Sequence, residues 1–254
     1  MTKTVLITGS TSGIGKACAI KFASQGWNVI INGRRKGHLD EIKKEIENSS
    51  NSKAFSLPFN VSDKNAVNTA IDNLPKEWRN IDLLINNAGL AVGLDPIHKG
   101  NPDDWDAMID TNIKGLLYVT KAIVPGMIKR KSGHIINIGS IAAKDVYPKG
   151  NVYCGTKRAV EAITFGMRMD LLDFNIKVSL VNPGATETEF SLVRFKGDIE
   201  KAENVYKGYK PLSGEDVANV IYFAATLPPH VNINDLLLMP TAQASANFFN
   251  KKTQ

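Results

Sequence analysis

Short, almost wholly apolar runs alternate with longer amphipathic segments along the 254 residues. The apolar runs are bounded by glycine, proline or polar residues, which is typical of buried strands. They predict strands at KTVLIT, NVIIN, AFSLPFNV, IDLLINNAG, GHIINIGS, IKVSLVNPG and DLLLM. Between them, apolar residues recur at helical spacing. These segments predict helices over 13–25, 39–46, 63–74, 102–128, 152–172 and 213–227.

The strands lack the alternation of apolar and polar residues that marks a half-exposed sheet. Continuous apolar strands indicate a parallel sheet covered on both faces. Strand–helix alternation with right-handed crossovers then predicts an α/β fold, a single-domain, doubly wound Rossmann sheet flanked by helices on both faces. The domain is expected to span 1–254, with a cofactor half over about 1–140. The irregular stretch 183–211 is interpreted as a mobile substrate lid, or as an ordinary surface excursion.

The sequence TGSTSGIG follows the first strand and leads into the first helix. Glycines in that context let the backbone approach a pyrophosphate, and the helix start offers free N–H groups. A tight turn without a ligand is the alternative. The predicted cofactor-binding residues of the turn are Gly9, Ser10, Thr11, Ser12, Gly13, Ile14 and Gly15.

The second strand ends at Gly33-Arg34-Arg35, where a dinucleotide's adenosine ribose is expected. An acidic side chain there favours a cofactor with a free 2′-hydroxyl, whereas an arginine guanidinium can donate two hydrogen bonds to a 2′-phosphate. Arg34 and Arg35 therefore predict NADP(H) rather than NAD(H), unless they are ordinary surface arginines.

Tyr153 and Lys157 are four residues apart, so they share one face of the predicted helix over 152–172. A free tyrosine has a pKa of about 10 and is a poor base at neutral pH. A neighbouring ammonium lowers the pKa of a phenol because it favours the phenolate. The pair therefore predicts a general acid/base, with Lys157 lowering the pKa of Tyr153.

Composition and charge argue against nucleic-acid, membrane and metal binding. The net charge is +6, but the basic residues are scattered and lack interleaved aromatics, so no nucleic-acid partner is predicted. No apolar run reaches the length of a membrane span, so no membrane partner is predicted. Cys18 and Cys154 are far apart, and the histidines show no ligand spacing, so no metal is predicted. A reducing cytoplasm is the expected location, and Cys154 is interpreted as a packing residue.

Five motifs in register resemble the short-chain dehydrogenase/reductase family over essentially the whole chain. They are TGSTSGIG, the NNAG that ends the fourth strand, Ser140 thirteen residues before Tyr153-x-x-x-Lys157, Asn112 in the preceding long helix, and NPGATET. The resemblance implies catalytic roles for Asn112, Ser140, Tyr153 and Lys157. It also implies that Tyr153, Lys157 and a further set of residues bind the cofactor: Asn60, Val61, Asn87, Ala88, Gly89, Pro183, Gly184, Thr186 and Thr188.

The resemblance also implies a separate role for each of the four catalytic residues. Tyr153 is the acid/base, Ser140 holds the substrate oxygen, and Lys157 also holds the nicotinamide ribose. Asn112 anchors a water that links Lys157 to solvent. One departure concerns the adenine: the family usually has an aspartate after the third strand, whereas this chain has Asn60, whose amide oxygen still accepts a hydrogen bond.

Further stretches, including DWDAMIDTNIKGLLYVTKAIVPGM and TEFSLVRFKGD, resemble the NADP-dependent 3-hydroxy acid (serine or allo-threonine) dehydrogenases of that family. This branch implies a short hydroxy acid or carbonyl substrate and a homotetramer. A buried substrate carboxylate needs a donor, so Arg194 is predicted to bind it, unless Arg194 is a solvated lid charge or a subunit contact. Tyr147 is predicted to line the pocket beside Ser140 and Tyr153, unless it is an ordinary surface or core tyrosine. The alternatives are a broad carbonyl reductase, a 3-oxoacyl thioester reductase, and a non-catalytic dinucleotide sensor.

Overall fold

The computed structural model describes residues 2–251, so Met1 and residues 252–254 of the predicted domain lie outside the described part. Seven parallel strands form one sheet in the order β3-β2-β1-β4-β5-β6-β7. Each predicted strand is present, as β1 (Thr4–Ile7), β2 (Asn28–Gly33), β3 (Ala54–Pro58), β4 (Leu83–Asn86), β5 (Gly133–Ile138), β6 (Ile176–Pro183) and β7 (Asp235–Leu238).

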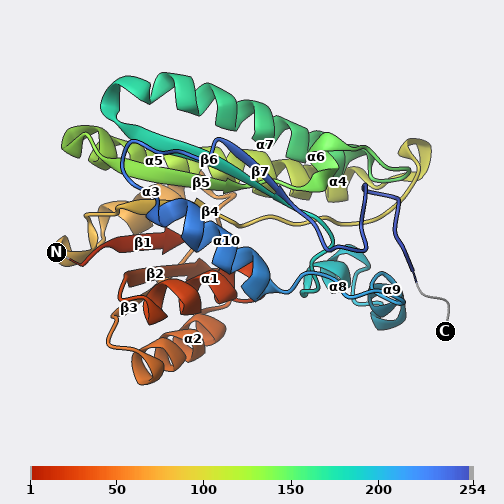
Figure 1. The fold of residues 1–254 in the computed structure, drawn as a ribbon, viewed down its shortest axis with the longest axis horizontal. Coiled ribbons are helices and arrows are strands. Elements are labelled where there is room, and N and C mark those ends of the chain that lie inside the picture. Colours follow the sequence, from red (N-terminus) through yellow and green to blue (C-terminus); the bar gives the residue numbers. More distant parts are fainter. Residues whose placement is uncertain (1, 252–254) are drawn as a thin grey trace.

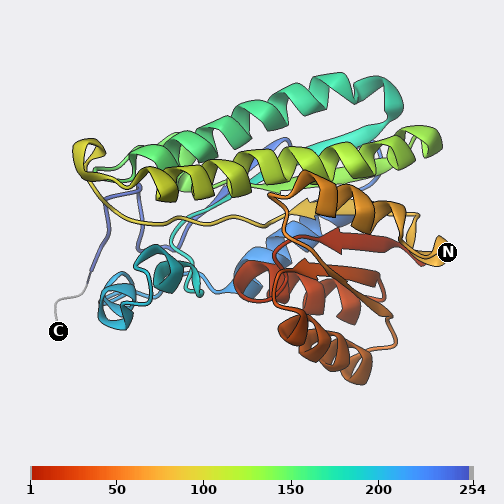
Figure 2. The same cartoon turned by 180° about the vertical axis from the view of Figure 1, so that it is seen from behind.

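Helices cover both faces of the sheet (Figures 1 and 2). The α-helices are α1 (Gly13–Ser24), α2 (Lys36–Ser49), α3 (Lys64–Asp72), α4 (Pro102–Ile109), α5 (Leu116–Arg130), α6 (Ile141–Lys144), α7 (Asn151–Asp170), α8 (Phe190–Arg194), α9 (Ile199–Asn204) and α10 (Gly214–Thr226). Short 3₁₀ turns lie at η1 (Lys76–Trp78), η2 (Ile97–Lys99) and η4 (Leu172–Phe174).

The side chains of successive strand residues point to opposite faces and form two separate cores. On one face, Val5 and Ile7 of β1 pack with α1, α2 and α10. On the other, Leu6 and Leu84 pack with α3, α5 and part of α7. The prediction of a parallel sheet covered on both faces is therefore confirmed.

Local signals explain several helix boundaries. Asp63 Oδ1 accepts hydrogen bonds from the Asn65 and Ala66 N–H groups and begins α3, as predicted from the sequence. Ser213 and Asp216 form a capping box at the start of α10. Gly26, with φ of 81°, follows the end of α1 in a conformation that glycine adopts without strain.

The predicted single helix over 102–128 is wrong in one respect. Between α4 and α5 the backbone forms a π-helical segment, η3 (Asp110–Gly115). The region 183–211 is also more regular than predicted, because it contains α8 and α9.

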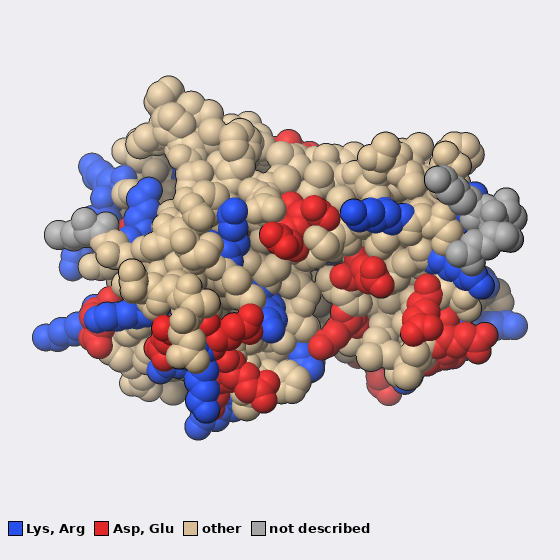
Figure 3. All heavy atoms as spheres, turned by 60° about the horizontal axis from the view of Figure 1, so that its bottom comes forward, with Lys and Arg blue, Asp and Glu red and all other residues tan. Residues whose placement is uncertain are grey.

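Among residues 2–251, no helix is both long enough and apolar enough to cross a membrane. On the face shown in Figure 3, acidic and basic side chains are interspersed.

Candidate active site

A pocket of about 690 Å³ opens at the carboxyl ends of the strands. The strand order reverses between β1 and β4, which is where doubly wound sheets bind ligands. The glycine turn after β1, the NNAG segment after β4, Ser140 after β5 and the Pro-Gly turn after β6 all contribute to its wall. The fold therefore gathers the separate sequence motifs around one cavity.

Most predicted cofactor and substrate residues line this pocket. They are Gly9, Thr11, Ser12, Gly13, Ile14, Arg34, Arg35, Asn60, Val61, Asn87, Ala88, Gly89, Ser140, Tyr147, Tyr153, Lys157, Pro183, Gly184, Thr186, Thr188 and Arg194. Three predicted residues lie behind the lining. Ser10 is buried and donates its hydroxyl to the Ile7 carbonyl at 2.7 Å. A Cβ on Gly15 would lie 2.2 Å from the Gly9 carbonyl oxygen. The third, Asn112, is described below.

The glycine turn is held in place from β4. The Asn87 amide donates to the carbonyls of Thr8 and Gly9, at 2.8 and 3.1 Å. In return, the Thr8 hydroxyl accepts the N–H groups of Asn87 and Ala88. Gly9 has φ of 66°, and a Cβ there would lie 2.9 Å from Ala88 Cα. In the structure, Asn87 thus fixes the turn through its side chain.

The start of α1 fits an anionic ligand. Ser12 occupies the N-cap position, but its side chain makes no capping hydrogen bond in the described structure. The first-turn N–H groups, which a helix cannot satisfy internally, therefore remain available beside the pocket. Arg34 and Arg35 lie exposed at the same end. Asn60 also lines this end and already accepts the Ser62 N–H through its amide oxygen.

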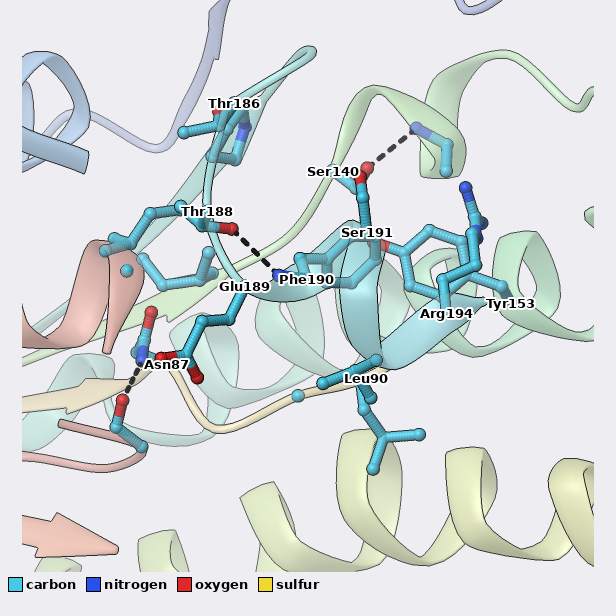
Figure 4. Close-up of a pocket in the computed structure, with 18 of the residues that line it drawn as sticks. Asn87, Leu90, Ser140, Tyr153, Thr186, Thr188, Glu189, Phe190, Ser191 and Arg194 are labelled. Carbon is cyan, nitrogen blue, oxygen red and sulfur yellow. Dashed lines mark hydrogen bonds between the residues drawn. The ribbon is translucent and has the colours of Figure 1, made fainter. Parts of the chain in front are cut away.

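Tyr153 and Ser140 meet deeper in the pocket (Figure 4). Burial raises the pKa of Tyr153 well above its usual value, and the neighbouring Tyr147 adds to this. Arg194 and a hydrogen bond from Ser140 act in the opposite direction. The Ser140 oxygen also accepts the Ala142 N–H at 3.1 Å, as the N-cap of α6. Its own proton is therefore free to point at the phenol or at a substrate oxygen.

Lys157 lies one helical turn from Tyr153 on α7. Its ammonium donates to the Ile138 carbonyl at 2.9 Å, and burial lowers the pKa of Lys157 to about 8. The sequence predicted that Lys157 lowers the pKa of Tyr153. In the structure the pKa of Tyr153 is raised, and the groups that oppose the rise are Arg194 and Ser140. Lys157 is not among the main influences on that pKa, so its predicted effect on the phenol stays a prediction.

Asn112 is buried in η3, and its amide joins two other elements. It accepts the Leu90 N–H and donates to the Leu90 carbonyl and the Thr156 hydroxyl, at 2.8, 2.9 and 3.0 Å. A Cβ on Gly89 would lie 3.2 Å from Asn112 Oδ1 and 3.4 Å from Lys157 Nζ. Asn112 Oδ1 and Lys157 Nζ therefore both lie close to the Gly89 backbone, where a side chain would crowd them.

A hydrogen-bonded network behind Ser140, which runs from buried Asn182 to the exposed Asp235 and Lys144, was missed from the sequence. The Ser140 N–H donates to Asn182 Oδ1 at 3.0 Å, and Asn182 Nδ2 donates to Asp235 on β7 at 2.6 Å. Lys144 pairs with both Asp235 and the buried Glu161. Asp235 fixes which end of the Asn182 amide faces Ser140. The adjacent Pro-Gly turn was the available signal, but the pairing with β7 depends on the fold.

Arg194 of α8 lies against Tyr153. Its guanidinium carbon is 5.1 Å from the centre of the Tyr153 ring and 5.4 Å from that of Tyr147. It also donates a hydrogen bond to the Tyr147 hydroxyl. Its buried Nε has no hydrogen-bond partner among the described residues. Lys196 lies outside the pocket lining, and its ammonium pairs with Asp104 at 2.8 Å.

The C-terminal segment also reaches the pocket. Gln243 accepts the Ala185 N–H at 2.8 Å, and Phe249 packs on Tyr209 with ring centres 4.9 Å apart. The segment thus folds back onto residues 183–211 of its own chain. Cys154 is buried beside Tyr153, as a packing residue should be. Within residues 2–251, no cluster of His, Cys, Asp or Glu has the arrangement of a metal site.

Comparison with known proteins agrees with this geometry. Residues 3–197 match the family model described as short chain dehydrogenase. The chain is 45% identical over 243 residues to an NADP-dependent 3-hydroxy acid dehydrogenase of Escherichia coli, covering 95% of this chain and 96% of that one. It is 44% identical over 249 residues to serine 3-dehydrogenase of Agrobacterium fabrum, covering 98% of each.

Solved structures show the same relationship. The closed form of serine dehydrogenase complexed with NADP+ superimposes with a TM-score of 0.92 at 44% identity, covering 99% of this chain and 100% of that one. Serine dehydrogenase from Escherichia coli gives a TM-score of 0.83 at 40% identity, covering 95% and 99%. With its fold, its motifs and most of its length matched, the chain belongs to the short-chain dehydrogenase family.

Proposed function

We propose that the chain is an NADP(H)-dependent oxidoreductase that interconverts short 3-hydroxy acids and the matching 3-oxo acids or semialdehydes. One observation carries the proposal: Ser140, Tyr153, Lys157 and Arg194 line a single pocket whose other end holds the glycine turn, Arg34 and Arg35. The names of the relatives, which include 3-hydroxy acid and serine dehydrogenases, support the same substrate class.

Different regions of the pocket fit different groups of the dinucleotide. The uncapped start of α1 suits a pyrophosphate, and Arg34 and Arg35 suit a 2′-phosphate. Pro183, Gly184, Thr186 and Thr188 line the pocket where the nicotinamide is proposed to lie. When bound, the nicotinamide supplies or accepts the hydride, while the protein places the substrate and moves a proton.

Tyr153 moves that proton. Its raised pKa keeps the phenol protonated near neutral pH, so it is ready to act as the acid when a carbonyl is reduced. For oxidation the phenol must first lose its proton, and the opposing effects of Arg194 and Ser140 favour that loss. Ser140 donates to the substrate oxygen, since the N–H of Ala142 already occupies one lone pair of the hydroxyl.

Lys157 and Asn112 provide the proposed route for the proton. The pKa of Lys157, about 8, brings its ammonium closer to exchange at neutral pH than that of an ordinary lysine. Lys157 Nζ and Asn112 Oδ1 both lie close to the Gly89 backbone, and a water held between them would link the two groups. Thr156 and Leu90 hold the Asn112 amide in place.

Arg194 is proposed to bind the substrate carboxylate, with Tyr147 alongside. The guanidinium is already next to the acid/base, and its buried Nε lacks a partner within the described residues. A carboxylate supplies the acceptor that this donor lacks. Because Tyr147 accepts from the same guanidinium, it orients the fork toward the reacting centre.

The substrate class is tested with Arg194→Ala. A charge-assisted hydrogen bond contributes about 1.5–3 kcal/mol, so the KM for serine should rise by about one to two orders of magnitude. The KM for a neutral secondary alcohol should change little. Lys196→Ala is the matched control, because it removes a nearby cation that faces Asp104 instead of the pocket. An equal rise in KM for serine and the neutral alcohol would refute the assignment of Arg194.

The proposal includes a homotetramer. On α7, the exposed residues Gly155, Phe165 and Met169 follow helical spacing, and Leu172 of η4 and Leu117 of α5 are also exposed. Helices α5 and α7 run alongside each other in both views (Figures 1 and 2). Such an apolar stripe is typical of a helix-pairing surface.

A reducing cytoplasm is the proposed location, supported by two cysteines that are both free and buried.

A further inference from the structure

An ion pair crosses the pocket between its two walls. Glu189 Oε2 lies 3.1 Å from Arg35 Nη2, which also donates to the Thr11 hydroxyl at 2.9 Å. Arg35 follows β2 on the adenosine side, whereas Glu189 directly precedes α8 in the lid region. Figure 4 shows Glu189 extending from the lid toward the side of the pocket formed by Asn87. The contact therefore joins segments that are 154 residues apart in the sequence.

The lid base is also seated on the glycine turn. A Cβ on Gly13 would lie 3.0 Å from the Thr188 Cβ, so the residue before Glu189 packs directly over the turn. Glu189 is the N-cap residue of α8, the helix that carries Phe190 and Arg194 to Tyr153. A change in the position of Glu189 is thus a change at the start of the helix that carries the proposed substrate-binding arginine.

The ion pair between Glu189 and Arg35 has a direct consequence for phosphate binding. Arg35 is one of the two arginines placed at the proposed 2′-phosphate site, and both Arg35 and Glu189 are about half exposed. A phosphate at the same guanidinium brings two negative groups together, which is unfavourable. An exposed ion pair of this kind contributes little free energy, so a phosphate can displace the carboxylate.

We propose that Glu189 occupies the place on Arg35 that the 2′-phosphate takes, and so sets how strongly the protein prefers NADP(H) over NAD(H). This inference rests on the proposed function, because it assumes that Arg35 binds the 2′-phosphate. Binding of the phosphate releases Glu189 from Arg35 and frees the start of α8. The 2′-phosphate end of the pocket is thereby coupled to the lid over the substrate.

Glu189→Gln tests the proposal, with NADPH and NADH titrated separately by fluorescence. Exposed ion pairs are worth at most about 1 kcal/mol, so the Kd for NADPH should fall by about two- to fivefold. The Kd for NADH should stay unchanged, because NADH lacks the phosphate. Glu187→Gln is the control, because it removes an exposed carboxylate two residues away that forms no ion pair with Arg35. Weaker NADPH binding, or equal effects on both coenzymes, would overturn the proposal.

Arg35→Ala separates this inference from the function on which it rests. If Arg35 binds the 2′-phosphate, its loss weakens NADPH but not NADH, and Glu189→Gln then has no further effect. If Arg35→Ala removes the preference but Glu189→Gln leaves both Kd values as they were, only the role of Glu189 is wrong. If Arg35→Ala leaves the preference intact, the phosphate site itself is wrong, and the inference is overturned with it.

Discussion

Tyr153 shows how far a reactive side chain depends on its surroundings. Its phenol is buried, which raises its pKa, and the two groups that oppose this come from different elements: Ser140 after β5, and Arg194 from α8. Burial lowers the pKa of Lys157 to about 8, and its ammonium lies close to Gly89, which suits its proposed part in proton transfer. The helical spacing of Tyr153 and Lys157 thus points to the proposed acid/base, while residues from elsewhere in the chain set its proton affinity.

Replacing Ser140 should move the pH profile of oxidation. The Ser140 hydrogen bond lowers the pKa of Tyr153, so its loss raises that pKa further. Oxidation requires the deprotonated phenol, so kcat/KM rises with pH, and the midpoint of that rise should move to higher pH in Ser140→Ala. The measurement is kcat/KM for hydroxy acid oxidation across pH. Ser140→Thr keeps a hydroxyl and should restore the midpoint, whereas an unchanged or lower midpoint in Ser140→Ala would contradict this account.

At the scale of elements, the sequence was most informative where the signals are local. Apolar runs located the strands, and Asp63 marked the start of α3 through its own side chain. The glycine turn was placed because a strand, a turn and a helix follow one another. In each case the deciding interactions lie within a few residues, so a pattern along the chain contains them.

Features that depend on distant contacts were not predictable in the same way. The π-helical segment η3 contains Asn112, whose amide bonds to Leu90 and Thr156 from two other segments. The pairing of Asn182 with Asp235, and of Arg35 with Glu189, joins residues that only the finished fold brings together. Ser10 and Gly15 belong to the predicted motif, yet they support the turn from behind.

The whole molecule places the ligand pocket and the exposed helix face on different surfaces. The pocket lies at the carboxyl ends of the strands, while α5 and α7 run along one outer face of the sheet (Figure 1). Residues 183–211 and the C-terminal segment lie at the same end of the sheet as the pocket, where Phe249 packs on Tyr209. The proposed association through α5 and α7 would therefore not cover the pocket.

Gly155→Leu tests this assembly without disturbing the isolated fold. A Cβ at Gly155 has no atom within 4 Å, and replacing an exposed helical glycine is expected to favour the helix by about 0.5–1 kcal/mol. The chain should therefore stay folded but lose its tetramer in sedimentation velocity. Gly37→Leu, at an equally open glycine on α2, should remain tetrameric. A wild-type protein that sediments as a monomer would refute the tetramer.

The most direct test of the central claim is the rate of NADP+ reduction across a matched set of alcohols. The set is serine, allo-threonine, 3-hydroxyisobutyrate and 3-hydroxypropionate against simple secondary alcohols that lack the carboxylate. The account predicts turnover of the 3-hydroxy acids, with higher kcat/KM than for the neutral alcohols, and a preference for NADP+ over NAD+. Activity on the neutral alcohols alone, or NADPH binding without turnover of any substrate, would contradict it.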